Sequence, residues 1–90
     1  MEELHKLSLI ERKVLQFCAR RKVTKEQLTM KFKNIPKLHR ERAIDQLQRY
    51  HFIDLIKVVN PETNRPRTLY FATDSGRKFL QQFEEWLSHN

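Results

Sequence analysis

The sequence predicts an α+β domain that is mainly α-helical, and three observations support this class. Apolar residues recur every three or four positions in several stretches, which is the spacing of helices that bury one face. Residues 53–59 are rich in β-branched side chains and partly alternate, which is typical of a strand. The chain has one Gly and three Pro, whereas an all-β fold needs many tight turns. Residues 1–90, with six Phe, two Tyr and one Trp, suffice for a single compact domain.

The first expected helix is a support helix over residues 8–22, and it begins at a capping box. Ser8 and Glu11 stand three residues apart, so each side chain can accept the backbone N–H of the other residue. The basic run 20–22 ends this helix, where cations favour the negative end of the helix dipole. Apolar side chains recur on one face at Ile10, Val14, Phe17 and Cys18.

Residues 24–50 predict a short helix, a tight turn and a longer helix. Thr24 and Gln27 form a second capping box at the start of the short helix. Pro36 suits the first position of the longer helix, because its missing N–H has no intrahelical partner there. Two helices joined by a short turn are the arrangement that lays one helix into the major groove of DNA.

The outer face of the longer helix is predicted to be polar and basic. Its apolar side chains Ala43, Ile44 and Leu47 fall on one side at about 100° per residue. The opposite side carries His39, Arg42, Gln46 and Arg49.

The next expected unit is a hairpin over residues 53–72, followed by a helix over residues 74–89. The hairpin joins strands 53–59 and 68–72 through a polar loop with two prolines and a basic tip. Thr73, Asp74 and Ser75 supply the cap of the last helix. A wide apolar face follows in that helix, formed by Phe79, Leu80, Phe83, Trp86 and Leu87.

A net charge of +7 and a pI near 9.9 point to a polyanionic partner. Nucleic acid is favoured over an anionic membrane surface as this partner, because no apolar run approaches the roughly 20 residues that span a bilayer. The first residues form no signal peptide, so we expect a cytoplasmic protein without a membrane partner. On the outer face of the longer helix, Arg42 and His39 are expected to reach base edges, with Gln46 at adenine or a phosphate. Phosphate contacts are expected from Lys31, Lys33, Arg49 and Lys57.

Neither catalysis nor a cofactor is expected. The chain has no Gly-rich phosphate loop, no nucleophile elbow and no pair of catalytic carboxylates. Its four His and its one Cys lack metal-ligand spacing, so we expect no metal. Cys18 lies on an apolar helix face and is predicted to be a core thiol, since a redox sensor needs an exposed thiolate.

Three stretches resemble small bacterial and archaeal regulators of the MarR, PadR and related types, a family of winged helix-turn-helix proteins. Residues 7–15 resemble the opening "L-T-x-x-E-x-x-V-L" of their first helix. Residues 47–53 resemble the "L-E-x-x-G-L-I" that leaves the recognition helix. Residues 69–77 resemble the "Y-x-L-T-x-x-G-R" that leaves the wing. The match covers nearly the whole chain, with His51 in place of the usual Gly and Arg40 where an apolar residue normally faces the core. Either Leu38 takes over that packing, or the helix starts in a shifted register.

The resemblance implies a three-helix core, a two-stranded β wing and a C-terminal helix. It also implies a homodimer that binds specific double-stranded DNA and regulates transcription, with repression favoured because no activation segment is present. By this resemblance the front of the recognition helix is Lys37, Leu38, His39 and Arg42, and the wing tip is Asn64, Arg65 and Arg67. The resemblance leaves any small-molecule effector unknown.

The last helix corresponds to the dimerising helix of many family members. The expected dimer interface comprises Phe79, Phe83, Trp86 and Leu87, together with Leu4 and Leu7 of the partner. The alternative is that the same apolar face packs onto the domain's own core.

Two other functions fit the same fold. One is a protein-interaction module of a replication or transcription assembly, which would show flat, weak affinity across DNA sequences. The other is a sequence-blind architectural or RNA-binding protein, which would show a strong salt dependence and no preferred site. Under the first alternative the charged face of the longer helix is an ordinary solvated surface. Under the second this face binds nucleic acid without sequence preference.

Overall fold

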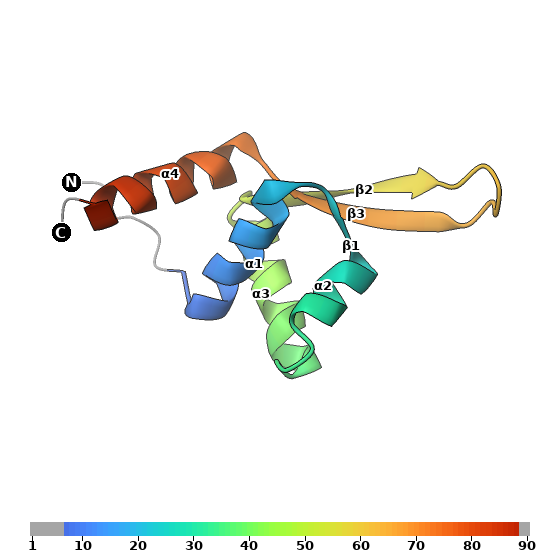
Figure 1. The fold of residues 1–90 in the computed structure, drawn as a ribbon, viewed down its shortest axis with the longest axis horizontal. Coiled ribbons are helices and arrows are strands. Elements are labelled where there is room, and N and C mark those ends of the chain that lie inside the picture. Colours follow the sequence, from blue (N-terminus) through green and yellow to red (C-terminus); the bar gives the residue numbers. More distant parts are fainter. Residues whose placement is uncertain (1–6, 89–90) are drawn as a thin grey trace.

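The computed structural model describes the backbone of residues 7–88 and the side chains of residues 7–85. Three helices form a central bundle, a long β hairpin projects from one end, and a fourth helix extends from the other (Figure 1). The elements are α1 (Leu9–Arg20), β1 (Val23–Thr24), α2 (Lys25–Lys31), α3 (Lys37–Arg49), β2 (Ile53–Val59), β3 (Pro66–Ala72) and α4 (Asp74–Ser88).

Both predicted capping boxes are present. Glu11 N donates to Ser8 Oγ at 3.1 Å, and Ser8 N donates to Glu11 Oε1 at 3.0 Å. Gln27 N donates to Thr24 Oγ1 at 3.0 Å, and Thr24 N donates to Gln27 Oε1 at 2.8 Å. Each box satisfies two backbone donors that a helix start leaves without intrahelical partners, which is why α1 and α2 begin where they do.

Helix α3 begins one residue later than the sequence predicted. Pro36 is the N-cap, with φ −54° and ψ 141°, and is not the first helical residue. Its carbonyl accepts the N–H of Arg40 at 3.0 Å, which starts the helical hydrogen bonding. The N–H of an N-cap residue has no intrahelical partner, so the missing N–H of Pro36 costs the helix no hydrogen bond here.

The sheet has three antiparallel strands in the order β1-β3-β2, where the sequence predicted two. Val23 pairs with Tyr70 and Thr24 with Leu69, so β1 extends the base of the hairpin. The hairpin itself runs from the pair Ile53 and Ala72 to the pair Val59 and Pro66. Strand β1 is too short to show a period, so the sequence pattern does not predict it. Strand β3 begins two residues earlier than predicted, because Pro66 resembles a loop residue by its type.

The end of α3 is a Schellman motif built without glycine. His51 adopts φ 62°, a left-handed conformation that favours Gly. Phe52 N donates to the Leu47 carbonyl at 2.9 Å, and His51 N donates to the Gln48 carbonyl at 3.0 Å. Thr73 Oγ1 donates to the His51 carbonyl at 2.5 Å. This turn, where the resembling regulators usually have Gly, is therefore made by a His in a left-handed conformation, and the hydroxyl of Thr73, just before α4, holds its carbonyl.

The core joins all four helices to the base of the sheet. Helix α4 lies on this core through Phe79 and Leu80, and Phe79 stacks on Phe52 with ring centroids 5.0 Å apart. The buried residues are Val14, Leu15, Cys18, Val23, Leu28, Phe32, Ala43, Leu47, Phe52, Ile53, Ala72, Phe79 and Leu80.

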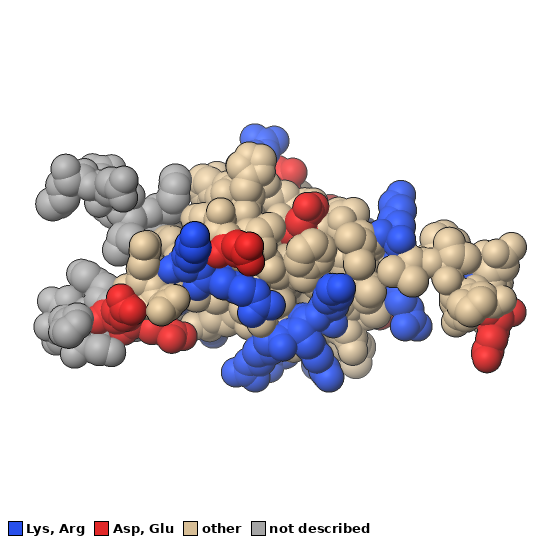
Figure 2. Space-filling view, turned by 90° about the horizontal axis from the view of Figure 1, so that it is seen from above, with Lys and Arg blue, Asp and Glu red and all other residues tan. Residues whose placement is uncertain are grey.

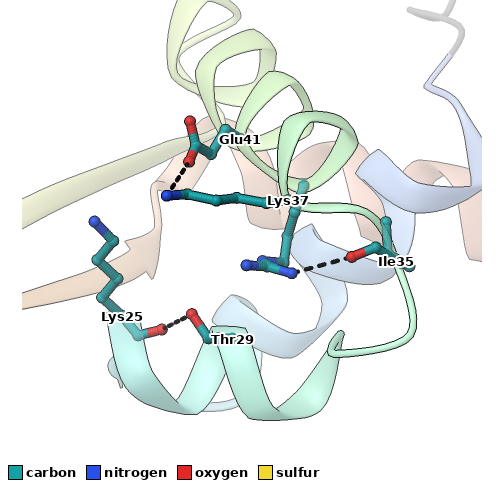
Figure 3. A network of polar contacts seen from close by, with 6 residues as sticks. Lys25, Thr29, Ile35, Lys37 and Glu41 are labelled. Atoms are coloured by element: carbon teal, nitrogen blue, oxygen red, sulfur yellow. Dashed lines mark hydrogen bonds and ion pairs between the residues drawn. The ribbon is translucent and has the colours of Figure 1, made fainter.

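Leu38 does not take over the core packing, because its side chain is 58% exposed; this exposure agrees with its predicted place at the front of the longer helix. Arg40 lies where an apolar residue was expected and is half-buried. Its Nη1 donates to the Ile35 carbonyl at 3.0 Å (Figure 3). The aliphatic stem of Arg40 can cover apolar surface while its guanidinium hydrogen-bonds the turn, so the core needs no apolar side chain at this position.

Candidate nucleic-acid interface

Helix α3 presents one continuous exposed face, because its Ala43 and Leu47 are buried in the core. Gln46, predicted on the outer side with Arg42, is half-buried. The exposed side chains of α3 are Lys37, Leu38, His39, Glu41, Arg42, Asp45 and Arg49.

Two of the cations on this face are paired within the helix. Lys37 Nζ lies 3.7 Å from Glu41 Oε1 (Figure 3), and Arg49 Nε lies 3.0 Å from Asp45 Oδ2. Exposed pairs of this kind contribute only about 0.3–0.5 kcal/mol, so a phosphate can replace either carboxylate at low cost. Within residues 7–85, Arg42 has no carboxylate partner, which leaves its guanidinium available to a ligand.

The three predicted contacts Arg42, Gln46 and Arg49 border an open hollow of about 610 Å³ between α3 and the start of α1. Leu7 and Glu11 line its other side. Leu7 was predicted at the dimer interface, so the expected DNA face and the expected dimer face meet at this hollow.

Lys31, predicted to contact phosphate, lies apart from that hollow. Its Nζ lies 5.8 Å from the centre of the Phe17 ring. With Lys13 and Arg20 it borders a second hollow, of about 400 Å³, between α1 and the turn that follows α2. Lys33 is exposed in that turn. Lys57 is exposed on β2, so the structure distributes the predicted phosphate contacts over three surfaces.

The hairpin β2-β3 is the wing, and its charges lie mainly along the strands. Its loop is closed by the Asn64 N–H, which donates to the Asn60 carbonyl at 2.7 Å, and Asn64 has φ 55°. Arg65 is exposed in this loop together with one acid, Glu62. Arg67 lies in β3 opposite Val58, so it belongs to the stem of the wing. Of the predicted wing-tip residues, Asn64 and Arg65 therefore lie in the loop, which also holds Glu62, and Arg67 lies on the adjoining strand.

Positive charge also lies away from α3. Figure 2 views the side of the domain opposite α2 and α3, and Lys and Arg gather there near the middle of the molecule. They also line both sides of the wing stem, whereas the wing tip shows an acidic side chain. Pattern analysis had assigned the run 20–22, at the end of α1, only to the helix dipole. Arg21 and Lys22 are exposed, and Lys22 Nζ lies 5.9 Å from the Phe71 ring.

The predicted dimer residues are only partly available. Phe79 is 6% exposed and serves the domain's own core. Phe83 is half-buried, stacks on Phe79 at 6.3 Å, and has the Arg12 guanidinium 4.9 Å above its ring. Leu7 is half-buried against the core. Leu4 and the side chains of Trp86 and Leu87 lie outside the described part of the chain.

Cys18 is a core thiol, as predicted. It is fully buried, and burial raises the pKa of its thiol from 9.0 to about 12. Across the described residues, no group of three His, Cys, Asp or Glu side chains could hold a metal ion. The same part of the chain contains no helix long and apolar enough to cross a membrane.

Solved structures share this fold at low sequence identity. A PadR-like transcription factor from Bacteroides fragilis matches with a TM-score of 0.73 and 15% identity, over 90% of this chain and 82% of the other. The protein smu.1704 from Streptococcus mutans UA159 matches at 0.71 and 19%, over 97% and 86%. A single-site mutant of Lactococcus lactis ZitR matches at 0.63 and 19%, over 100% and 66%. No protein-family model and no curated protein sequence matches the chain. The predicted mainly α-helical winged helix-turn-helix fold is confirmed.

Proposed function

We propose that this winged-helix protein regulates transcription by binding specific double-stranded DNA, with α3 in the major groove. The observation that carries the proposal is the exposed face of α3, on which Arg42 has no carboxylate partner in the described chain. Arginine is the residue that most often reads guanine in this groove. The net charge of +7 supplies the attraction to the phosphate backbone that precedes base contacts.

The wing is proposed to lie beside α3 on the DNA. Arg65 is exposed next to Pro66, which stiffens the end of the loop, and Arg67 follows on β3. Both side chains suit phosphate or minor-groove contacts. Glu62 limits how deeply the tip can enter a groove, so we expect the stem cations to contribute more than the loop.

Selection from a random duplex library tests base recognition. Bound fragments are sequenced, and the affinity for the recovered site is followed against salt. Arg42→Ala is expected to cost about 1–3 kcal/mol on that site and to relax the preference at one position. Arg65→Ala is expected to weaken all sequences alike and to lower the slope of log K against log salt by about 0.9.

Arg77→Ala is the matched control, because it removes the same charge from an exposed position on α4. It should leave the base preference unchanged. The proposal fails if Arg42→Ala and Arg65→Ala bind the selected site as well as the parent does at moderate salt.

The regulator is further proposed to act as a homodimer and to repress by covering its site. Symmetric subunits would select a pseudo-palindrome with half-sites about one turn, ~34 Å, apart. Because Phe79 is used by the domain's own core, Phe83 and the end of α4 carry the proposed interface. A Trp86→Ala variant that keeps the parent's dimer mass by light scattering would argue against this interface.

A protein-interaction module is the second candidate, and the wing supports it. Ile56, Val58 and Val59 are 36%, 43% and 55% exposed, which is unusual for three apolar side chains so close in one strand. This function predicts a stable protein complex and no consensus from the DNA selection.

A further inference from the structure

Leu38 is an apolar side chain that the fold does not use. It is the second residue of α3 and is 58% exposed. The nearby core-facing position of α3 is occupied by Arg40, whose Nη1 donates to the Ile35 carbonyl. Leu38 is therefore not needed to fill that position. Truncating Leu38 therefore removes little from the folded state, and its side chain is accessible to a partner.

Arg42 lies one helical turn beyond Leu38. Side chains four residues apart share a helix face, so both point away from the core in the same direction. The neighbouring cations Lys37 and Arg49 each face a carboxylate of α3 itself. Within residues 7–85 the planar guanidinium of Arg42 has no carboxylate partner, so on this face it is the group best suited to two parallel hydrogen bonds.

These two side chains match two features of the major groove. Thymine presents a methyl group there, which suits apolar contact, and guanine presents the O6 and N7 acceptors. Four helical residues rise about 6 Å, and base pairs stack roughly 3.4 Å apart, so the two contacts span at most about two base pairs.

We propose that Leu38 reads a thymine methyl group while Arg42 reads a guanine no more than two base pairs away. Each half-site then carries this thymine and guanine pair on one groove edge. This inference rests on the proposed function, because it requires α3 to enter the major groove of a preferred site.

Replacing thymine by deoxyuridine in the selected duplex is a direct test, because it removes the methyl group and keeps every hydrogen-bonding atom. Each thymine is replaced in turn, and the Kd is measured for the parent and for Leu38→Ala. One replacement per half-site should weaken the parent about fourfold, the value of one buried methyl-sized group at ~0.8 kcal/mol. Leu38→Ala should bind both duplexes equally, whereas the control Leu9→Ala, which truncates a similarly exposed leucine on α1, should keep the parent's sensitivity.

A second replacement tests Arg42. Substituting 7-deazaguanine removes the N7 acceptor from a single guanine. It should weaken the parent severalfold and leave Arg42→Ala unchanged, at a guanine within two base pairs of the thymine found above.

The outcomes separate this inference from the proposed function. A clear consensus without a methyl effect, or with the effect retained in Leu38→Ala, overturns the role of Leu38 and leaves a specific regulator standing. A thymine and guanine farther than two base pairs apart overturns their pairing on one helix face. Salt-sensitive binding with no consensus overturns the proposed function, and this inference with it.

Discussion

Replacing the single glycine, Gly76, by alanine should destabilise the domain, although the residue lies in a helix. Gly76 is buried in the first turn of α4, where that helix crosses the start of β2. An added Cβ would overlap the Phe52 carbonyl oxygen and would lie 3.1 Å from Leu15 Cδ1. The Phe52 carbonyl is backbone and already accepts the N–H of Thr73 at 2.9 Å, so it cannot move freely.

The size of the effect follows from three contributions. Forcing a methyl-sized group into a packed site costs about 1–3 kcal/mol. Displacing the Phe52 carbonyl weakens its hydrogen bond to Thr73 by about 0.5–1.5 kcal/mol. Alanine regains about 1 kcal/mol over glycine in a helix interior. The net expectation is a loss of about 0.5–3.5 kcal/mol, which is a fall in Tm of roughly 2–28 °C for a domain of this size.

Urea and thermal unfolding, followed by circular dichroism, measure this change. Ser75→Ala is the control, because Ser75 is the exposed neighbour in the same turn and should change stability by less than about 0.5 kcal/mol. The sign of the Gly76→Ala effect is decisive. If α4 did not approach Phe52 closely, helix propensity alone would make Gly76→Ala more stable by about 1 kcal/mol. A rise in Tm would therefore refute the docking of α4 described above.

Other changes test other parts of the fold. His51→Gly should raise stability by about 0.5–1 kcal/mol in the same unfolding assays, because Gly adopts the left-handed conformation without steric cost. Thr24→Ala should lower stability by about 1 kcal/mol through loss of the α2 cap, whereas Thr63→Ala in the wing loop should not. Between pH 9 and 12 the folded Cys18 thiol keeps a proton that the unfolded chain releases, so stability should fall as pH rises, by up to about 1.4 kcal/mol per unit. Cys18→Ala should remove the fall between pH 9 and 10; the raised pKa of Tyr70 adds a further fall above 10.

Much of the fold could be predicted because its signals act over four or five residues. The two capping boxes, the apolar period of α1 and the β-branched run of β2 are local features, and each appears where the pattern placed it. The short strand β1 could not be predicted, because Val23 and Thr24 form a strand only by pairing with β3, about 46 residues along the chain.

The residues of the candidate site were predicted more successfully than their arrangement in space. The exposure of Lys37, His39, Arg42 and Arg49 followed from the polar face of α3. The exposure of Leu38 agrees with its predicted place at the front of this helix. The hydrogen bond from Arg40 to the Ile35 carbonyl was not predicted, because it depends on the shape of the preceding turn. The separation of Lys31 from the hollow beside Arg42 depends on how α2 packs against α1.

Composition and local pattern were therefore enough to establish a basic, mainly helical domain with a helix-turn-helix and a β hairpin. Charge and periodicity are properties of neighbouring residues, so they can be read before folding is considered. Packing between distant segments settled that Phe79 is used by the domain's own core, and strand pairing settled that Arg67 lies on the stem of the wing. These features depend on distances between residues far apart in the chain, and such distances exist only once the core has formed.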